Sequence, residues 1–314
     1  MPTVVITDHV FPSLEIEQEL LGAIGATVVS LQARSEVDLL DAVTDADALL
    51  VCYAPVTDRV IRRMTRCRII ARYGIGVDNV DLGAATAKGI VVTNVPDYCV
   101  DEVSDHALAL LLACARRIPA LAGRVRGGRW NARDAAPMHR LRGQTLGLVG
   151  FGKIPRRLAD KARALGLEVM AFDPYVAGEE MEARGVQKTS LHGLLARSDF
   201  VSVHAPLAPE TRGMIAEAQL RAMKRSAYLI NTARGPLVLE SASSVRSRKN
   251  GSRALHWTSC STSRPRPTTP YSASRMSSLR RTWHSIPRSR SRNCSGRQPK
   301  KSSARSRDGR RARR

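Results

Sequence analysis

Short apolar runs alternate with amphipathic segments along the first hundred residues. The apolar runs lie at residues 4–7, 27–31, 48–52, 68–72 and 90–94. Between them, 13–25 and 36–44 carry apolar residues at the spacing of one helix face. Short strands separated by helices are typical of βαβ units and a parallel sheet. We therefore predict a first α/β domain over residues 1–98.

The same alternation resumes further along the chain. A helix is predicted over 100–118, because its apolar residues recur at core spacing. A stretch with several Gly and Arg residues at 124–143 is typical of a connecting arm, and strands and helices alternate again from residue 145. The pattern predicts a second α/β domain over residues 99–240.

Near residue 240 this pattern gives way to serine and arginine. Residues 241–314 contain 18 Arg and 19 Ser, which is half of that segment. Because such a composition cannot bury a core, we expect these residues to form a disordered basic tail.

Net charge is concentrated in the tail. It holds 21 of the 50 Lys and Arg residues but one of the 28 acids, so most of the formal charge of +22 belongs to it. A basic surface over the whole chain would indicate nucleic acid or an anionic membrane as the partner. The part before residue 240 gives no such indication. We expect contact with nucleic acid only incidentally, through the tail, and a dedicated nucleic-acid-binding appendage stays open as the alternative.

Targeting signals and metal motifs are not evident. Residues 2–8 have the pattern of a strand, without a basic n-region or an apolar h-region. The longest apolar run, 107–115, is too short for a bilayer span. The cysteines before residue 240 show no CxxC or His-paired spacing, so we interpret them as buried apolar residues. These observations predict a cytoplasmic protein without a membrane segment or a metal.

The most specific local motif is a glycine turn. Gly150-Phe151-Gly152-Lys153-Ile154-Pro155 follows a buried strand at 145–149 and begins a helix, and the next strand ends at Asp173. Gly150 permits the tight turn, and Gly152 lets the backbone approach a pyrophosphate at the positive end of the helix. This context predicts a dinucleotide site, with a purely structural glycine turn as the alternative.

Two residues of the motif predict the choice and the affinity of the cofactor. Asp173 is placed to accept a hydrogen bond from a ribose 2′-hydroxyl and to repel a 2′-phosphate, which favours NAD over NADP. Pro155 stands where the third glycine of the fingerprint is usual. Proline is tolerated in the first turn of a helix, but its ring adds bulk at a close contact. We expect the helix to form and the affinity for the cofactor to be weakened.

Further motifs carry a resemblance to a known family. They are Arg72 to Asp81 (RYGIGVDNVD), Thr93-Asn94-Val95-Pro96, the glycine turn with Asp173, His204-Ala205-Pro206-Leu207 and Asn231-Thr232-Ala233-Arg234-Gly235. Together the motifs resemble the D-isomer-specific 2-hydroxyacid dehydrogenase family, and most closely its branch similar to the C-terminal binding proteins. The resemblance covers residues 1 to about 239.

The resemblance implies a fold and an activity. The fold would comprise two doubly wound parallel-sheet domains, a flavodoxin-like substrate domain over 1–98 and an incomplete Rossmann NAD domain over 99–240. The activity would be reversible reduction of a small 2-keto acid to a D-2-hydroxy acid with NAD, by a homodimer. A non-catalytic, NAD-sensing protein similar to corepressors is the second hypothesis.

It also assigns roles to individual residues. Arg234 would hold the substrate carboxylate and polarise the 2-keto oxygen, while Gly74, Ile75 and Gly76 would line the substrate. The residues expected to bind the cofactor are Gly150, Phe151, Gly152, Lys153, Ile154, Asp173, His204, Ala205, Pro206, Thr232, Ala233 and Arg234. A salt-bridged loop arginine is the alternative for Arg234. For His204 the favoured interpretation is a hydrogen-bonding histidine at a strand end, without a role in proton transfer.

The glutamate and histidine that the family uses for acid-base chemistry are missing. His256 and His284 lack the Pro-His context of the family. Yet residues 279–288 can be written in codons that, read two nucleotides later, give Thr-Pro-His-Val-Ala-Phe-Tyr-Ser-Glu. Residues 253–259 shift in the same way to Gly-Ala-Ala-Leu-Asp-Val, and 261–270 to Asp-Glu-Pro-Pro and then Asp-His-Pro. We interpret these matches as a frameshift near codon 240; an unrelated cloning artefact is the alternative.

Overall fold

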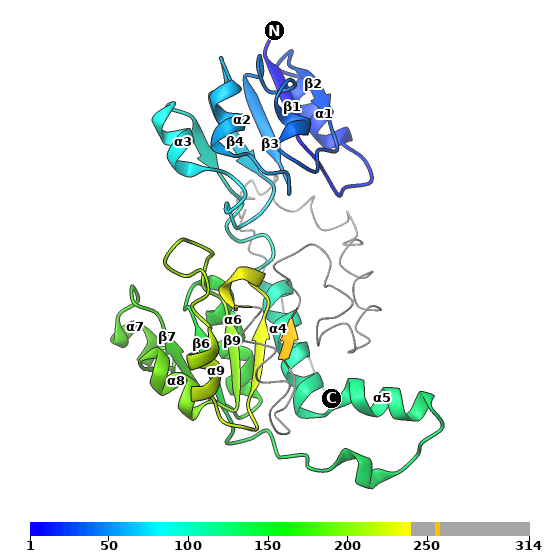
Figure 1. The fold of residues 1–314 in the computed structure, drawn as a ribbon, viewed down its shortest axis with the longest axis vertical. Coiled ribbons are helices and arrows are strands. Elements are labelled where there is room, and N and C mark those ends of the chain that lie inside the picture. Colours follow the sequence, from blue (N-terminus) through cyan, green and yellow to red (C-terminus); the bar gives the residue numbers. More distant parts are fainter. Residues whose placement is uncertain (240–254, 258–314) are drawn as a thin grey trace, which may run out of the picture. The chain divides into compact units, whose positions relative to one another are not determined.

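The structure is a computed structural model that describes residues 1–239 and 255–257 (Figure 1). The predictions for the basic tail, including His284 and most of the shifted codons, fall on residues outside this described part. Within it, each helix is either too short or too polar to cross a bilayer.

The first sheet is parallel and has five strands. They are β1 (Thr3–Ile6), β2 (Thr27–Ser30), β3 (Ala48–Val51), β4 (Ile69–Arg72) and β5 (Val91–Thr93). Their order is β2-β1-β3-β4-β5, so the strand order reverses between β1 and β3. The helical connections are α1 (Glu15–Gly22), the 3₁₀ helix η1 (Val37–Leu39), α2 (Asp58–Arg63) and α3 (Leu82–Ala87). This is the flavodoxin-like order that the resemblance implied.

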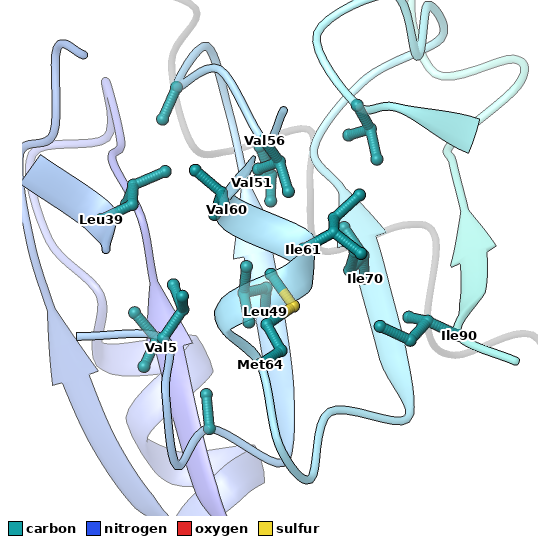
Figure 2. Packing of buried hydrophobic residues seen from close by; sticks show 14 of the residues in the cluster. Val5, Leu39, Leu49, Val51, Val56, Val60, Ile61, Met64, Ile70 and Ile90 are labelled. Atoms are coloured by element: carbon teal, nitrogen blue, oxygen red, sulfur yellow. The ribbon is translucent and has the colours of Figure 1, made fainter. Parts of the chain in front are cut away.

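One face of this sheet carries a continuous apolar core (Figure 2). Val5, Leu49 and Ile70 are register partners on neighbouring strands, and each is fully buried. Ile61 of α2 and Leu39 of η1 belong to the same cluster. These three buried register partners keep the strands in fixed register, which positions the loops that follow the strands.

The prediction of a helix over 36–44 was wrong. The structure has the short helix η1 followed by turns, with Leu39 and Val43 fully buried. Asp38 accepts hydrogen bonds from the backbone amides of Arg34 and Ser35, at 2.8 and 2.9 Å. An aspartate that bonds to nearby backbone in this way competes with a regular helix.

The second sheet has six parallel strands. They are β6 (Thr145–Val149), β7 (Glu168–Phe172), β8 (Gln187–Lys188), β9 (Phe200–Val203), β10 (Tyr228–Asn231) and β11 (Leu255–Trp257). The order is β11-β10-β9-β6-β7-β8, which reverses between β6 and β9. The helices are α6 (Lys153–Ala164), α7 (Gly178–Glu182), α8 (Leu191–Arg197), α9 (Glu217–Ala222) and the 3₁₀ helix η3 (Gly235–Leu237). The predicted α/β fold with two parallel sheets is thus confirmed.

One strand lies beyond the predicted end of this domain at residue 240. The backbone of β11 pairs in parallel with β10, with Leu229 opposite Leu255 and Asn231 opposite Trp257. β6, β9 and β10 are buried along their whole length, as expected for a parallel sheet covered on both faces.

The long helix predicted over 100–118 is divided in two. Helix α4 (Val100–Ala115) ends before Arg117, whose φ of 53° is left-handed, and α5 (Ile118–Arg126) begins at once with a proline in its first turn. Pro119 could not continue α4, because its ring would clash with the carbonyl of Ala115.

The predicted arm is a closed loop that includes part of α5. After α5 the chain passes through the 3₁₀ helix η2 (Ala132–Ala135). The guanidinium of Arg117 donates hydrogen bonds to the carbonyls of Ala135 and Ala136. Arg124 binds the carboxylate of Asp134 at 3.0 Å. Arg117 and Arg124 therefore fasten the far side of this loop, at residues 134–136.

Candidate functional site

The glycine turn lies at the carboxyl end of β6, where the strand order reverses. Gly150 has a φ of +93°, and a Cβ there would lie 3.0 Å from the backbone nitrogen of Ala205. Both the conformation and the close approach require glycine. A Cβ at Gly152 would meet nothing within 4 Å, so the space beside the start of α6 is open.

Helix α6 begins as the fingerprint predicts, despite the proline. Pro155 is the third residue of the helix and is buried, and the amide of Arg156 makes the first bond, to the carbonyl of Gly152. The missing N–H of Pro155 is one that a helix start leaves unpaired in any case. Ile154 is half-buried, and the amine of Lys153 lies 3.5 Å from Asp97.

Asp173 follows β7 and is tied to the glycine turn. One carboxylate oxygen accepts a hydrogen bond from the amide of Phe151 at 2.8 Å, and the other accepts from the amide of Tyr175 at 2.9 Å. Each carboxylate oxygen has two lone pairs, so Asp173 keeps acceptor capacity for a ribose hydroxyl. Its backbone contacts also make it a support of the turn, which the sequence did not suggest.

His204 follows β9 and is kept neutral by its surroundings. Its ring Nε2 lies 2.8 Å from the hydroxyl of Ser202, and its amide donates to the carbonyl of Val149. Burial lowers the pKa of His204 to about 4. A histidine with this pKa is uncharged near pH 7 and is poorly suited to general acid chemistry.

The loops after β9 and β10 hold the remaining residues assigned to the cofactor. Thr211 fastens the first loop, since its hydroxyl donates to the carbonyl of Pro206 at 2.7 Å. In the second loop Asn231 donates to the carbonyl of Arg234 and accepts from the amide of Ala233. The hydroxyl oxygen of Thr232 is buried and has no hydrogen-bond partner among the described residues. A buried hydroxyl without a partner indicates a group that a ligand would satisfy.

The loop expected to line the substrate follows β4. The side-chain amide of Asn94 donates to the carbonyl of Ile75 at 2.7 Å, and the amide of Val95 donates to the carbonyl of Gly74. A Cβ at Gly76 would overlap the guanidinium of Arg234. Glycine at this position therefore lets the arginine lie directly against the loop.

Arg234 forms an ion pair that the sequence analysis did not assign. Its Nε lies 2.9 and 3.0 Å from the two carboxylate oxygens of Asp78, and its Nη1 donates to the carbonyl of Ala233. This agrees with the alternative of a salt-bridged arginine. Because a guanidinium has five N–H donors, the pair also leaves donors for a substrate carboxylate.

Two further residues near the first sheet were missed. Asp8, 7% exposed at the end of β1, accepts hydrogen bonds from the amides of Cys52, Tyr53 and Ala54. The guanidinium of Arg72 lies 6.0 Å from the ring centroid of Tyr53, and its buried Nε has no hydrogen-bond partner among the described residues. Neither residue has a periodic signal; a charged residue at the end of an apolar run (Arg72) or directly after one (Asp8) was the available clue.

The geometry fits a dinucleotide. The space at Gly152, the acceptor capacity of Asp173 and the buried hydroxyl of Thr232 all lie at carboxyl ends of strands of one sheet, where ligands bind in such folds. Among residues 1–239 and 255–257, no group of three His, Cys, Asp or Glu side chains is arranged to hold a metal ion.

Comparison with known proteins agrees with this geometry. Residues 108–245 match the model of the D-isomer specific 2-hydroxyacid dehydrogenase NAD binding domain. A D-3-phosphoglycerate dehydrogenase of Mycobacterium bovis is 40% identical over 252 residues, which is 77% of this chain and 45% of that protein. The chain thus spans about half the length of this curated relative.

Solved structures share the fold over most of both chains. A D-lactate dehydrogenase from Aquifex aeolicus, crystallised with NAD and lactic acid, has a TM-score of 0.75 and 29% identity, and the match covers 82% of this chain and 77% of that one. A protein from Thermus thermophilus has a TM-score of 0.75 and 32% identity, covering 87% and 86%. Residues 108–245 therefore form an NAD-binding domain of the D-isomer specific 2-hydroxyacid dehydrogenase family, and the chain shares its fold with these solved structures.

Proposed function

We propose that this chain descends from an NAD-dependent oxidoreductase that interconverts a small 2-keto acid and the corresponding D-2-hydroxy acid. The observation that carries the proposal is the glycine turn at Gly150 with Asp173 bonded to it, in a domain of the matched family. NAD(H), when bound, supplies or accepts the hydride. The residues of this chain bind and orient the two reactants.

The substrate end of the proposed site is cationic. Arg234, which lies against Gly76, would hold the carboxylate common to all 2-keto acids. Arg72 supplies a second guanidinium without an acidic partner among the described residues. This arrangement supports small substrates with a carboxylate, including those with a second anionic group, as in the phosphoglycerate named for the mycobacterial relative.

General acid catalysis is the function for which this chain is least well equipped. His204 is neutral and hydrogen-bonded, and His256 has no family motif around it. Loss of an acid-base pair lowers the rate roughly 10²- to 10⁴-fold. We therefore expect this chain to bind NAD(H) and to turn over slowly.

The frameshift near codon 240 is part of the proposal. Residues 255–257 pair with β10 in the structure, and the stretch 253–259 that contains them shifts to Gly-Ala-Ala-Leu-Asp-Val, a strand-like sequence. The pairing supports the idea that this stretch descends from the next strand of the sheet. Sequencing the locus tests it: the idea fails if no frame after codon 240 encodes the Glu-Pro and Pro-His motifs.

We propose that the chain forms a homodimer and that the segment around α5 is its interface. None of the residues of α5 is buried, and Ile118, Val125 and Trp130 are exposed, Trp130 by 87%. Exposed apolar residues grouped on one segment are typical of a protein interface. The cytoplasmic location stays a prediction.

The second hypothesis is a non-catalytic protein close to the C-terminal binding proteins, and it predicts different assay results. It would bind NAD and dimerise in response, yet show no turnover even after repair of the frame. The named relatives, a phosphoglycerate dehydrogenase and a lactate dehydrogenase, favour the enzyme.

The decisive assay is NADH oxidation with glyoxylate, pyruvate, hydroxypyruvate and phosphohydroxypyruvate. We expect the chain as written to stay far below the median enzyme rate of about 10 s⁻¹. The frame-restored protein, as the matched control, should gain turnover. Rapid turnover by the unrepaired chain would contradict the assigned loss of the acid-base pair, and none by the repaired chain would contradict the enzyme itself.

A further inference from the structure

A chain of contacts links Asp173 to an arginine of the cofactor helix. The amide of Phe151 donates to Asp173 at 2.8 Å, and the carbonyl of Phe151 accepts from the Nε of Arg156 at 2.9 Å. Phe151 is fully buried, so it fixes both contacts. Arg156 is therefore separated from the Asp173 carboxylate by the backbone of a single residue.

The guanidinium of Arg156 is held in place and neutralised by one acid. Its carbon lies 5.3 Å from the ring centroid of Phe151, and its Nη1 lies 2.5 Å from a carboxylate oxygen of Glu180 in α7. The Arg156 side chain is 25% exposed and that of Glu180 is 49% exposed. The arginine is thus the fixed partner, while the glutamate reaches it from a short surface helix.

This arrangement bears on the choice between NAD and NADP. In dinucleotide-binding domains the acid at the end of the second strand selects the 2′-hydroxyl of NAD, and a nearby arginine accommodates the 2′-phosphate of NADP. Here both residue types are present, joined through Phe151. The Nε of Arg156 is bonded to the Phe151 carbonyl and its Nη1 to Glu180, and the Glu180 carboxylate repels a phosphate that approaches the remaining donors.

We propose that the Arg156–Glu180 pair is a specificity-determining element for the cofactor: Arg156 is a latent 2′-phosphate-binding residue, and Glu180 keeps it occupied. Asp173 and Glu180 then exclude NADP in two ways, by repulsion and by withholding a cation. The inference rests on dinucleotide binding in the proposed function.

The test is the affinity of the full-length chain for NADH and NADPH, measured by fluorescence titration. Glu180→Gln should tighten NADPH about 5- to 10-fold relative to NADH, since one charge-assisted hydrogen bond becomes available to the phosphate. Glu179→Gln, one residue away and without an ion pair to any described residue, loses the same charge and should leave the ratio within about twofold. The double variant Arg156→Gln/Glu180→Gln should lose the gain.

Salt provides an independent readout. The gain in Glu180→Gln should shrink as the ionic strength rises, because a partly exposed arginine–phosphate contact is screened. If Glu180→Gln and Glu179→Gln change the ratio equally while both bind NADH, the inference is overturned and dinucleotide binding stands. If the unmodified chain binds neither dinucleotide, the proposed function falls and this inference with it.

Discussion

The two sheets reverse their strand order in the same way, yet the two crevices at the reversal differ. In the first sheet the carboxylate of Asp8 follows β1, beside this reversal, and accepts hydrogen bonds from three amides after β3. In the second sheet Gly150 places no side chain there, and the hydroxyl of Thr232, directly after β10, has no hydrogen-bond partner among the described residues. A crevice whose polar groups are satisfied internally serves stability. One whose groups are left open indicates a ligand.

The strongest test of this contrast is Asp8→Ala. Three backbone amides would lose their acceptor, and each buried amide left unpaired costs about 1–3 kcal/mol, so we expect the free energy of unfolding to fall by at least about 3 kcal/mol. Urea denaturation measures it, with the exposed Asp45→Ala as control. An Asp8→Ala protein as stable as the control would show that the first crevice has no structural role.

The pH dependence of stability should report on the second crevice. Because the pKa of His204 is lowered from 6.5 to about 4, the unfolded chain binds a proton between these values that the folded chain does not. Stability should therefore fall by about 2 kcal/mol as the pH drops from 6.5 towards 4. His204→Asn should remove that part of the slope, and the exposed His192→Asn should retain it. Equal slopes in both variants would contradict the assignment.

Paired glycine substitutions sharpen the comparison within the crevice. Gly150→Ala forces a left-handed residue against the backbone of Ala205 and should cost roughly 1–2 kcal/mol of stability. Gly152→Ala has free space for its methyl group, so it should fold normally but bind NADH about tenfold more weakly. Thermal unfolding and NADH titration separate the two effects. The opposite pattern would mean that Gly152 is structural and Gly150 is not.

The smallest expected effect concerns the buried proline. Pro155→Gly should tighten NADH by about two- to threefold by relieving the contact between α6 and the strand, at a cost of under about 1 kcal/mol in stability. Titration of both proteins with NADH measures it. An unchanged or weaker affinity would show that the ring of Pro155 packs without strain.

Apolar periodicity predicted most of the fold. The strands predicted for the first sheet and the two around the glycine turn agreed within one or two residues, because each apolar run is long enough to cross a buried sheet, whereas the short strands β8 and β11 were not predicted. The errors came from local chemistry that periodicity ignores: Asp38 bonding to nearby amides, and Pro119 ending a helix. The glycine turn was predictable because its motif is contiguous. The partners Asp8, Asp78 and Glu180 were not, since their contacts join residues far apart in the chain or depend on a side-chain rotamer.

The closed loop around α5 has a consequence for how the chain tolerates change. Arg117 turns the chain out of α4 and also contacts the carbonyls of Ala135 and Ala136, so the two ends of the loop lie within reach of one side chain. A surface loop with adjacent ends can be lengthened, shortened or exchanged while the sheet that follows keeps its place. This segment can therefore acquire new sequence, and new binding partners, without any compensating change in the nucleotide-binding crevice.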